Sequence, residues 1–120
     1  MQDFRTLKVW EKSHSLVLAV YKLTMNFPGE ERFGLILQIR RSVAAIPTDI
    51  AEGCGSLKGQ DYARFMQSAL RSACELEYQL LLSKDLTYTP ADLYAELELR
   101  VVEVKKMLSA YIQRIRAGNL

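Results

Sequence analysis

The chain has 120 residues, of which 49% are hydrophobic and 25% are charged, and this composition is typical of one globular domain. We therefore expect a single domain over residues 1–120. Sixteen Lys and Arg residues against fourteen Asp and Glu residues give a net charge of only +2, which excludes a strongly basic protein of the histone-like class. With six Gly, three Pro and few alternating apolar runs, the sequence also argues against a β-sandwich or a β-barrel.

The first predicted helix covers residues 7–26, where Leu16, Val20 and Leu23 recur at helical spacing before a Phe-Pro-Gly break. The second begins near Glu31 and continues past Pro47 to the Gly53-Cys54-Gly55 sequence. Proline lacks a backbone donor and crowds the preceding turn, so we expect this helix to kink by more than about 20°. We interpret Gly53-Cys54-Gly55 as a helix C-cap followed by a tight turn.

The third predicted helix has Asp61 in its first turn and ends near Asp85. The fourth begins with Thr89 as candidate N-cap and Pro90 at the first helical position, and it continues to Gly118. Because the connections are short, successive helices must run antiparallel. The predicted fold is an all-α, up-down-up-down antiparallel four-helix bundle with a Pro-kinked second helix.

Several sequence motifs occur in a fixed order along about two-thirds of the chain. They are Val-Trp near the start, Tyr-x-Leu-Thr followed by Phe-Pro, Gly-Leu-x-x-Gln-x-Arg-Arg, Ile-Pro-x-x-Ile-Ala-Glu-Gly, and Ser-x-x-Glu-Leu. In these motifs the chain resembles the bacterial four-helix bundle protein family, also called the 23S ribosomal RNA intervening-sequence protein family. The fourth predicted helix matches the family only in periodicity.

This resemblance implies a non-enzymatic bundle that self-associates, in characterised members as a ring-like homopentamer. It also implies a relation to the accessory variability determinant proteins of diversity-generating retroelements, which associate with a reverse transcriptase and nucleic acid. The chain departs from the family pattern at Asp49, Ser56, Leu57 and Arg71. Two basic residues that relatives tend to carry after the glycines are absent here, which weakens the transfer of nucleic-acid binding to this loop.

Charged residues of the second and third predicted helices suggest ion pairs. In an antiparallel arrangement Arg41 lies level with Glu75, and Glu52 lies level with Arg64. We predict structural ion pairs there, between helices or between subunits. A nucleic-acid contact by Arg40 and Arg41 is the alternative, and one of these two arginines should face outward because both cannot enter one core.

Positive charge is concentrated near the end of the fourth predicted helix. Residues 100–120 carry five basic groups and one acidic group, whereas residues 1–99 carry eleven basic and thirteen acidic groups. The predicted nucleic-acid contacts are Lys105, Lys106, Arg114 and Arg116, assisted by Lys58 and by the outward-facing member of Arg40 and Arg41. An oligomer would repeat this patch and increase its avidity.

Other chemistry has little support in the sequence. Glu11 and His14 have the Glu-x-x-His spacing of di-iron bundles, but a complete site needs a second such motif and the chain has one histidine. Cys54 and Cys74 are too far apart for a Cys-x-x-Cys pair, and we expect Cys74 in the core and Cys54 near a loop. No cofactor and no bound metal are expected.

The leading hypothesis is a non-enzymatic, oligomeric accessory protein that binds RNA, DNA or an enzyme of nucleic-acid metabolism through a basic surface. A protein-protein scaffold without nucleic-acid affinity is the alternative, and a metal-dependent bundle enzyme is a remote one. The N-terminal sequence lacks the apolar region of a secretory signal, and no stretch is apolar enough to span a membrane. We therefore expect a cytoplasmic protein.

Overall fold

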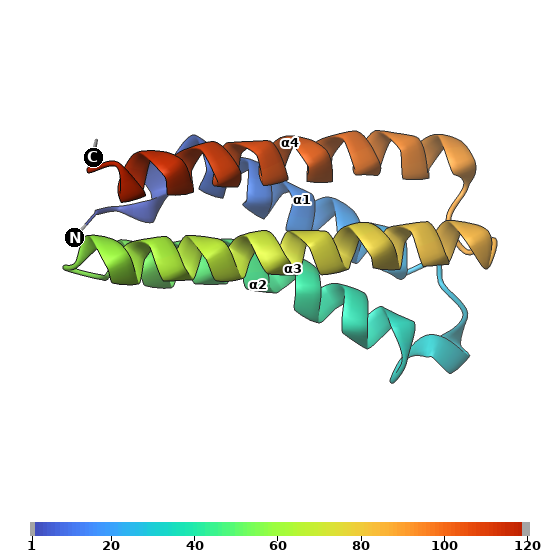
Figure 1. Ribbon diagram of the computed structural model, residues 1–120. Coiled ribbons are helices and arrows are strands. Elements are labelled where there is room, and N and C mark those ends of the chain that lie inside the picture. Colours follow the sequence, from blue (N-terminus) through green and yellow to red (C-terminus); the bar gives the residue numbers. More distant parts are fainter. Residues whose placement is uncertain (1, 119–120) are drawn as a thin grey trace.

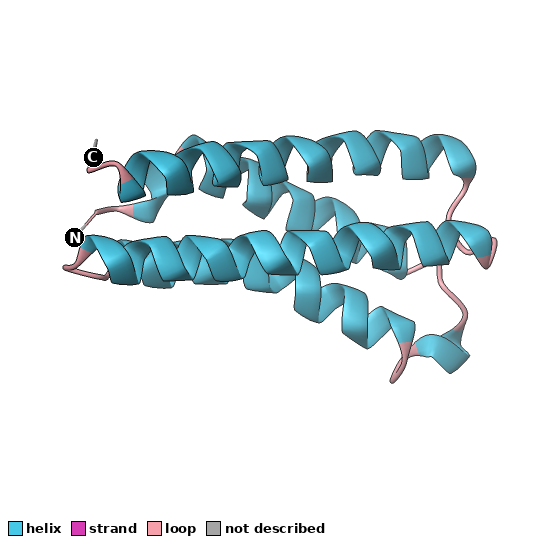
Figure 2. Ribbon diagram, in the orientation of Figure 1, coloured by secondary structure: helices cyan, strands magenta, loops and turns pink. Residues whose placement is uncertain are grey.

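The computed structural model describes residues 2–118, and this range forms four long helices and no strand. The helices are α1 (Lys8–Thr24), α2 (Leu35–Cys54), α3 (Gly59–Asp85) and α4 (Ala91–Arg116). Short 3-10 turns at Phe4–Thr6 and Gly29–Glu31 precede α1 and α2. Successive helices run in opposite directions (Figure 1) and are joined by short loops (Figure 2). The predicted all-α, up-down-up-down four-helix bundle is confirmed.

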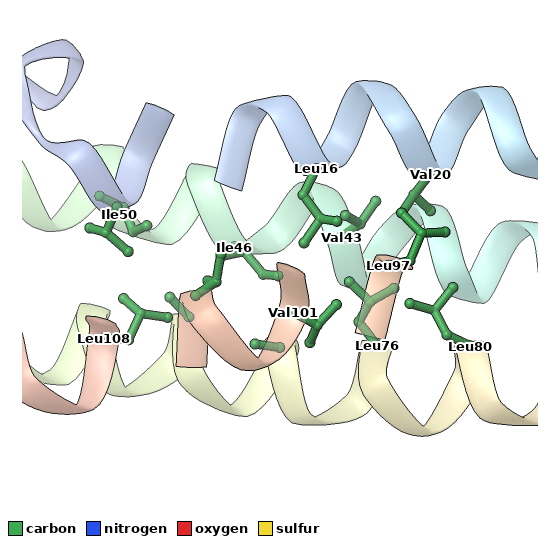
Figure 3. Packing of buried hydrophobic residues seen from close by; sticks show 14 of the residues in the cluster. Leu16, Val20, Val43, Ile46, Ile50, Leu76, Leu80, Leu97, Val101 and Leu108 are labelled. Atoms are coloured by element: carbon green, nitrogen blue, oxygen red, sulfur yellow. The ribbon is translucent and has the colours of Figure 1, made fainter. Parts of the chain in front are cut away.

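The core is a continuous apolar layer to which every helix contributes. Figure 3 shows side chains from the four helices meeting along the bundle axis. Leu16, Ile46, Leu76 and Leu108 are all fully buried. α3 packs closely against α2 and α4, while α1 packs mainly on α2 and less on α4. The three-and-four spacing read from the sequence therefore identifies the faces that meet.

The start of α2 is fixed by a carboxylate from the preceding turn. Glu31 Oε1 accepts a hydrogen bond from the Leu35 backbone N–H at 3.1 Å, and Glu31 Oε2 accepts one from the Tyr88 hydroxyl at 2.9 Å. A Cβ atom at Gly34 would lie 2.8 Å from Glu31 Oε1, so a glycine at this position leaves room for the contact. α2 begins later than predicted because residues 29–31 form the 3-10 turn that presents Glu31.

Thr89 does not cap α4 as predicted. Its side chain is buried, and its hydroxyl is hydrogen-bonded to the Ser83 hydroxyl at 2.8 Å. Pro90 takes the N-cap position instead, and its carbonyl accepts the backbone N–H of Tyr94 at 2.9 Å. Thr89 thus links the α3–α4 connection to the end of α3, and its side chain accepts no backbone N–H of α4.

The Gly53-Cys54-Gly55 sequence ends α2 as predicted, with Gly55 as the C-cap and Cys54 next to the connection, but the positions of Gly53 and Cys74 differ from the prediction. Gly53 lies inside the helix, and the C-cap residue Gly55 has a right-handed backbone with φ −80°. Cys54 is buried at the last position of α2, and desolvation by this burial raises the pKa of its thiol. Cys74 is exposed and not in the core, because it lies beside the buried stripe of α3 rather than on it.

α2 is helical on both sides of Pro47, so neither a strand nor two separate helices interrupt it. Thr48, the residue after Pro47, donates its Oγ1 hydroxyl to the Ala44 carbonyl one turn earlier at 2.7 Å. The kink itself stays a prediction. We expect Pro47→Ala to straighten α2, because alanine restores the missing donor and removes the clash with the Val43 carbonyl. Crystal structures of both proteins would test this, and an unchanged helix axis would contradict it.

Candidate nucleic-acid interface

Four exposed cations gather at the end of the bundle that also holds both ends of the described chain. We call Lys8, Lys58, Arg114 and Arg116 the basic end cluster. Lys8 and Arg114 line one hollow of about 290 Å³ between the start of α1 and the end of α4. Arg116 lines a second, of about 300 Å³, together with Gly59, the residue after Lys58. The antiparallel fold places the start of α1, the connection between α2 and α3, and the end of α4 at one end of the bundle (Figure 1), and each of these segments carries at least one of the four cations.

A hydrogen-bonded group holds these segments together. The hydroxyls of Tyr62 on α3 and Tyr111 on α4 are 2.5 Å apart, and Tyr62 also donates to Gln2 Oε1 at 3.0 Å. The backbone N–H of Gln2 donates to the Cys54 carbonyl at 2.9 Å. Desolvation, followed by the hydrogen bond with Tyr111, raises the pKa of Tyr62, so this hydroxyl stays protonated. The start of the chain is thereby tied to α2, α3 and α4.

The basic end cluster keeps its charge available. Within residues 2–118, none of its four members forms an ion pair, whereas the neighbouring Arg5 is paired with Asp3 at 3.3 Å. The Arg114 guanidinium lies 5.8 Å from the centre of the Tyr111 ring. Arg114 and Arg116 are also placed in the last turn of α4, where cations complement the helix dipole. Unpaired and exposed, these groups suit contacts with phosphate.

Lys105 and Lys106 lie apart from the basic end cluster. Lys105 donates to Glu77 Oε1 on α3 at 2.6 Å, and this hydrogen bond raises the pKa of Lys105. Lys106 is exposed. Ten residues separate Lys106 from Arg116, which is about 15 Å along a helix. The structure therefore divides the predicted helix-end patch in two, and a carboxylate already neutralises part of the distant half.

Arg40 and Arg41 have different surroundings. Arg40 Nε donates to Thr24 Oγ1 at 2.9 Å, and its guanidinium lies 4.7 Å from the centre of the Tyr21 ring. Arg40 Nη2 also lies 3.4 Å from the Tyr21 carbonyl oxygen. Arg41 is exposed. The outward-facing member of the pair is thus Arg41, and Arg40 joins two sequence motifs, Tyr-x-Leu-Thr and Gln-x-Arg-Arg, across α1 and α2.

We expect Arg40→Ala to lower the free energy of unfolding by about 1–2 kcal/mol, since it removes a charged hydrogen bond and a cation-π contact. Arg41→Ala is the matched control, with an expected change below about 0.5 kcal/mol. Urea denaturation of the two variants measures both values. Equal effects would contradict a specific structural role for Arg40.

The predicted Glu52–Arg64 ion pair is not formed within one chain. Arg64 instead pairs with Asp61 on its own helix, at 2.6 Å. Glu52 and Arg64 do line the same hollow, together with Asp49, but the arginine side chain is directed along α3. Asp61 is three residues from Arg64 on the same helix, so the two side chains meet without crossing to α2. An intersubunit pair by Glu52 stays a prediction.

Within one chain the predicted Arg41–Glu75 pair is also replaced, whereas an intersubunit pair by Arg41 stays a prediction. Glu75 accepts a short hydrogen bond from the buried Ser42, the residue that follows Arg41. Successive residues of α2 are rotated by 100° about the helix axis. Ser42 therefore faces α3 while Arg41 faces outward. Asp49 accepts from Ser68 at 2.9 Å, which gives this departure from the family pattern a structural partner. Hydroxyl-carboxylate contacts, rather than ion pairs, therefore link α2 and α3.

Glu11 and His14 do not form part of a metal site in the described range. Both side chains are exposed, and the His14 ring stacks on Trp10 with a centroid distance of 5.0 Å. Across residues 2–118, no three His, Cys, Asp or Glu side chains are grouped closely enough to hold a metal ion.

The fold and the basic end cluster define a class of protein: a four-helix bundle with exposed cations from several segments at one end. The family described as 23S rRNA-intervening sequence protein matches residues 5–110, and the chain belongs to this family. The expected family membership is confirmed. None of the helices in the described range has the length and apolar character needed to cross a membrane.

A crystal structure from Bacteroides thetaiotaomicron VPI-5482 is similar to this chain. It is described as a protein with unknown function from the S23 ribosomal protein family. The two are 27% identical, the match covers 87% of this chain and 97% of the other, and the TM-score is 0.79. A comparison with curated proteins gave no significant match.

Proposed function

We propose that the protein is a non-enzymatic, cytoplasmic accessory protein that self-associates and binds RNA or DNA through the basic end cluster. The observation that carries this proposal is the convergence of four exposed cations at one end, none of which forms an ion pair with another residue of 2–118. The family name, which refers to an rRNA intervening sequence, is consistent with a role near nucleic acid.

Binding of this kind would be electrostatic. Lys and Arg side chains contact phosphate without reading base sequence, and each contact releases counterions. The net charge of +2 gives one chain little attraction as a whole. Several copies of the basic end cluster in one oligomer would act together, so that weak contacts add to a useful avidity.

We expect the triple variant Lys58→Gln, Arg114→Gln, Arg116→Gln to lose most of its nucleic-acid affinity. The slope of log affinity against log salt should decrease by about 2 to 3, because each lost phosphate contact contributes roughly 0.7 to 0.9. Retardation of labelled RNA and DNA over a range of salt concentrations measures both effects.

The double variant Lys105→Gln, Lys106→Gln is the control for position on α4. We expect it to change the salt slope by less than about 1, since Glu77 already pairs with Lys105. A larger loss of nucleic-acid affinity in this variant than in the triple variant would indicate that the binding site lies in the middle of α4. If the unmodified protein fails to retard RNA and DNA at low salt, nucleic-acid binding is overturned.

A protein-protein scaffold is the second candidate, and exposed apolar side chains favour it. Met25 and Phe33 are 76% and 82% exposed, and Leu18 is 61% exposed. Clustered apolar residues on a surface mark sites of protein contact. They also support the self-association in the leading proposal, for which the resemblance suggests five copies. If light scattering gives the mass of a dimer, five copies per oligomer is wrong. If it gives the mass of a monomer at micromolar concentration, self-association is wrong.

A further inference from the structure

The surface where α1 meets α2 combines exposed apolar residues with unpaired cations. We call it the α1–α2 face. Its apolar members are Leu18, Tyr21, Met25, Phe33 and Leu37, and its cations are Lys22, Arg32, Arg40 and Arg41.

Helical spacing and one side-chain contact place the members on α1 and α2 on one surface. Leu18, Tyr21 and Met25 are separated by three and four positions, so they form one stripe along α1. Leu37 and Arg41 are four positions apart along the outer side of α2. The contact between Arg40 and Tyr21 joins the two stripes at their edge.

The α1–α2 face is positively charged. None of its four cations forms an ion pair in the part of the chain that the structure describes. The Glu31 carboxylate, in the connection between the two helices, is already used by the Leu35 N–H and the Tyr88 hydroxyl. Glu30 is exposed and is the other carboxylate of this connection. The face therefore suits an apolar surface of negative charge.

The chain itself has such a surface on the first half of α4. We call Asp92, Glu96, Leu99 and Glu103 the α4 face. These residues are spaced by four, three and four positions, so they lie on one side of the helix, and Leu99 is 71% exposed. The cation of this segment, Arg100, is directed toward α1, where it donates to Ser15 Oγ at 3.0 Å. Glu103 is paired with Lys12 of α1 at 3.2 Å, so Asp92 and Glu96 carry the negative charge that remains for a partner.

The two faces cannot meet within one chain. α4 packs against α1 and α3 and lies across the core from α2, with no Cα atom within 8 Å of an α2 Cα atom in the described range. Leu99 and its neighbours lie opposite the buried stripe of α4, which contains Leu97, Val101 and Leu108. The α4 face can therefore meet an α1–α2 face only on another molecule.

We propose that the α1–α2 face of one copy packs against the α4 face of a second copy. This inference rests on the self-association proposed above and names the surfaces that produce it. Such an interface is head-to-tail, because the two surfaces differ. Each added copy leaves one α1–α2 face and one α4 face free until a ring closes. Apolar residues at the centre and opposite charges at the rim fit the composition of protein interfaces.

Charge reversal tests this pairing. Arg41→Glu and Glu96→Arg should each weaken association at least tenfold, because each places like charges across the interface. The double variant should recover the mass of the unmodified protein. Light scattering over a range of protein concentrations measures mass, and circular dichroism checks that each variant stays helical. Arg71→Glu on α3 is a control with the same charge change as Arg41→Glu, and it should leave the mass unchanged.

The outcomes separate the two proposals. If the unmodified protein is monomeric, self-association fails, and this pairing fails with it. If it associates but the single reversals have no effect, or the double variant does not recover, the pairing is overturned while self-association stands. Should a single variant lose helicity, Arg32→Glu with Asp92→Arg repeats the test on the same two faces.

Discussion

Replacing Leu76 with alanine is expected to lower the free energy of unfolding by about 2–5 kcal/mol. The Leu76 side chain is fully buried on α3, the helix that packs closely against both α2 and α4. It lies among core residues of other helices in Figure 3. Truncation would remove apolar contacts and leave a cavity that the long helices could close only in part. Urea denaturation followed by circular dichroism measures the change.

Leu57→Ala is the control for this substitution. Leu57 lies in the connection between α2 and α3 and is 83% exposed, so the same loss of atoms should change the free energy of unfolding by less than about 0.5 kcal/mol. A change below about 1 kcal/mol for Leu76→Ala would contradict the central position of this residue in the core.

Gly53→Ala is expected to lower the free energy of unfolding by about 1–3 kcal/mol. A Cβ atom at Gly53 would lie 2.8 Å from Phe65 Cβ and 2.9 Å from Met66 Cε. Helix propensity alone would favour alanine by roughly 0.5–1 kcal/mol. We expect the steric cost to exceed this gain, since Phe65 Cβ is attached directly to the backbone of α3 and can move only with the helix.

Gly59→Ala provides a matched control for Gly53→Ala. A Cβ atom at Gly59, the first residue of α3, would meet no heavy atom within 4 Å. We expect alanine there to be neutral, or to stabilise by up to about 1 kcal/mol through reduced freedom of the unfolded chain. Thermal or urea denaturation of both variants tests the contrast. Equal destabilisation would argue against close packing of α2 on α3 as the reason for glycine at 53.

The fold was predictable because each helix repeats its apolar residues without a competing period. Leu97, Val101, Val104 and Leu108 illustrate this on α4, and all four are buried. The helix ends were less predictable. Glu31 acts at the start of α2 from within a separate turn, and Thr89 bonds to Ser83 instead of capping α4. Both contacts depend on loop conformation, which periodicity does not describe.

The candidate site could be predicted only in outline. Sequence spacing places Arg40 and Arg41 100° apart on a helix, but it does not say which of them meets Thr24. It also does not reveal that Glu77 of a neighbouring helix pairs with Lys105, nor that Lys8 and Arg114 line one hollow. Such contacts are set by helix rotation and side-chain conformation. A charge count along the chain identified the basic end of α4 and missed the contribution from α1.

The hydrogen bonds of Gln2 hold the beginning of the described chain at the same end of the bundle as Arg116. Any segment fused before residue 2 or after residue 118 would therefore emerge beside the basic end cluster. A flexible tether keeps its cargo at an effective concentration in the millimolar range near its attachment point. A histidine-rich purification tag at either terminus would compete with, or add to, the phosphate contacts proposed for the basic end cluster. Nucleic-acid assays on this protein should use chains from which the tag has been cleaved.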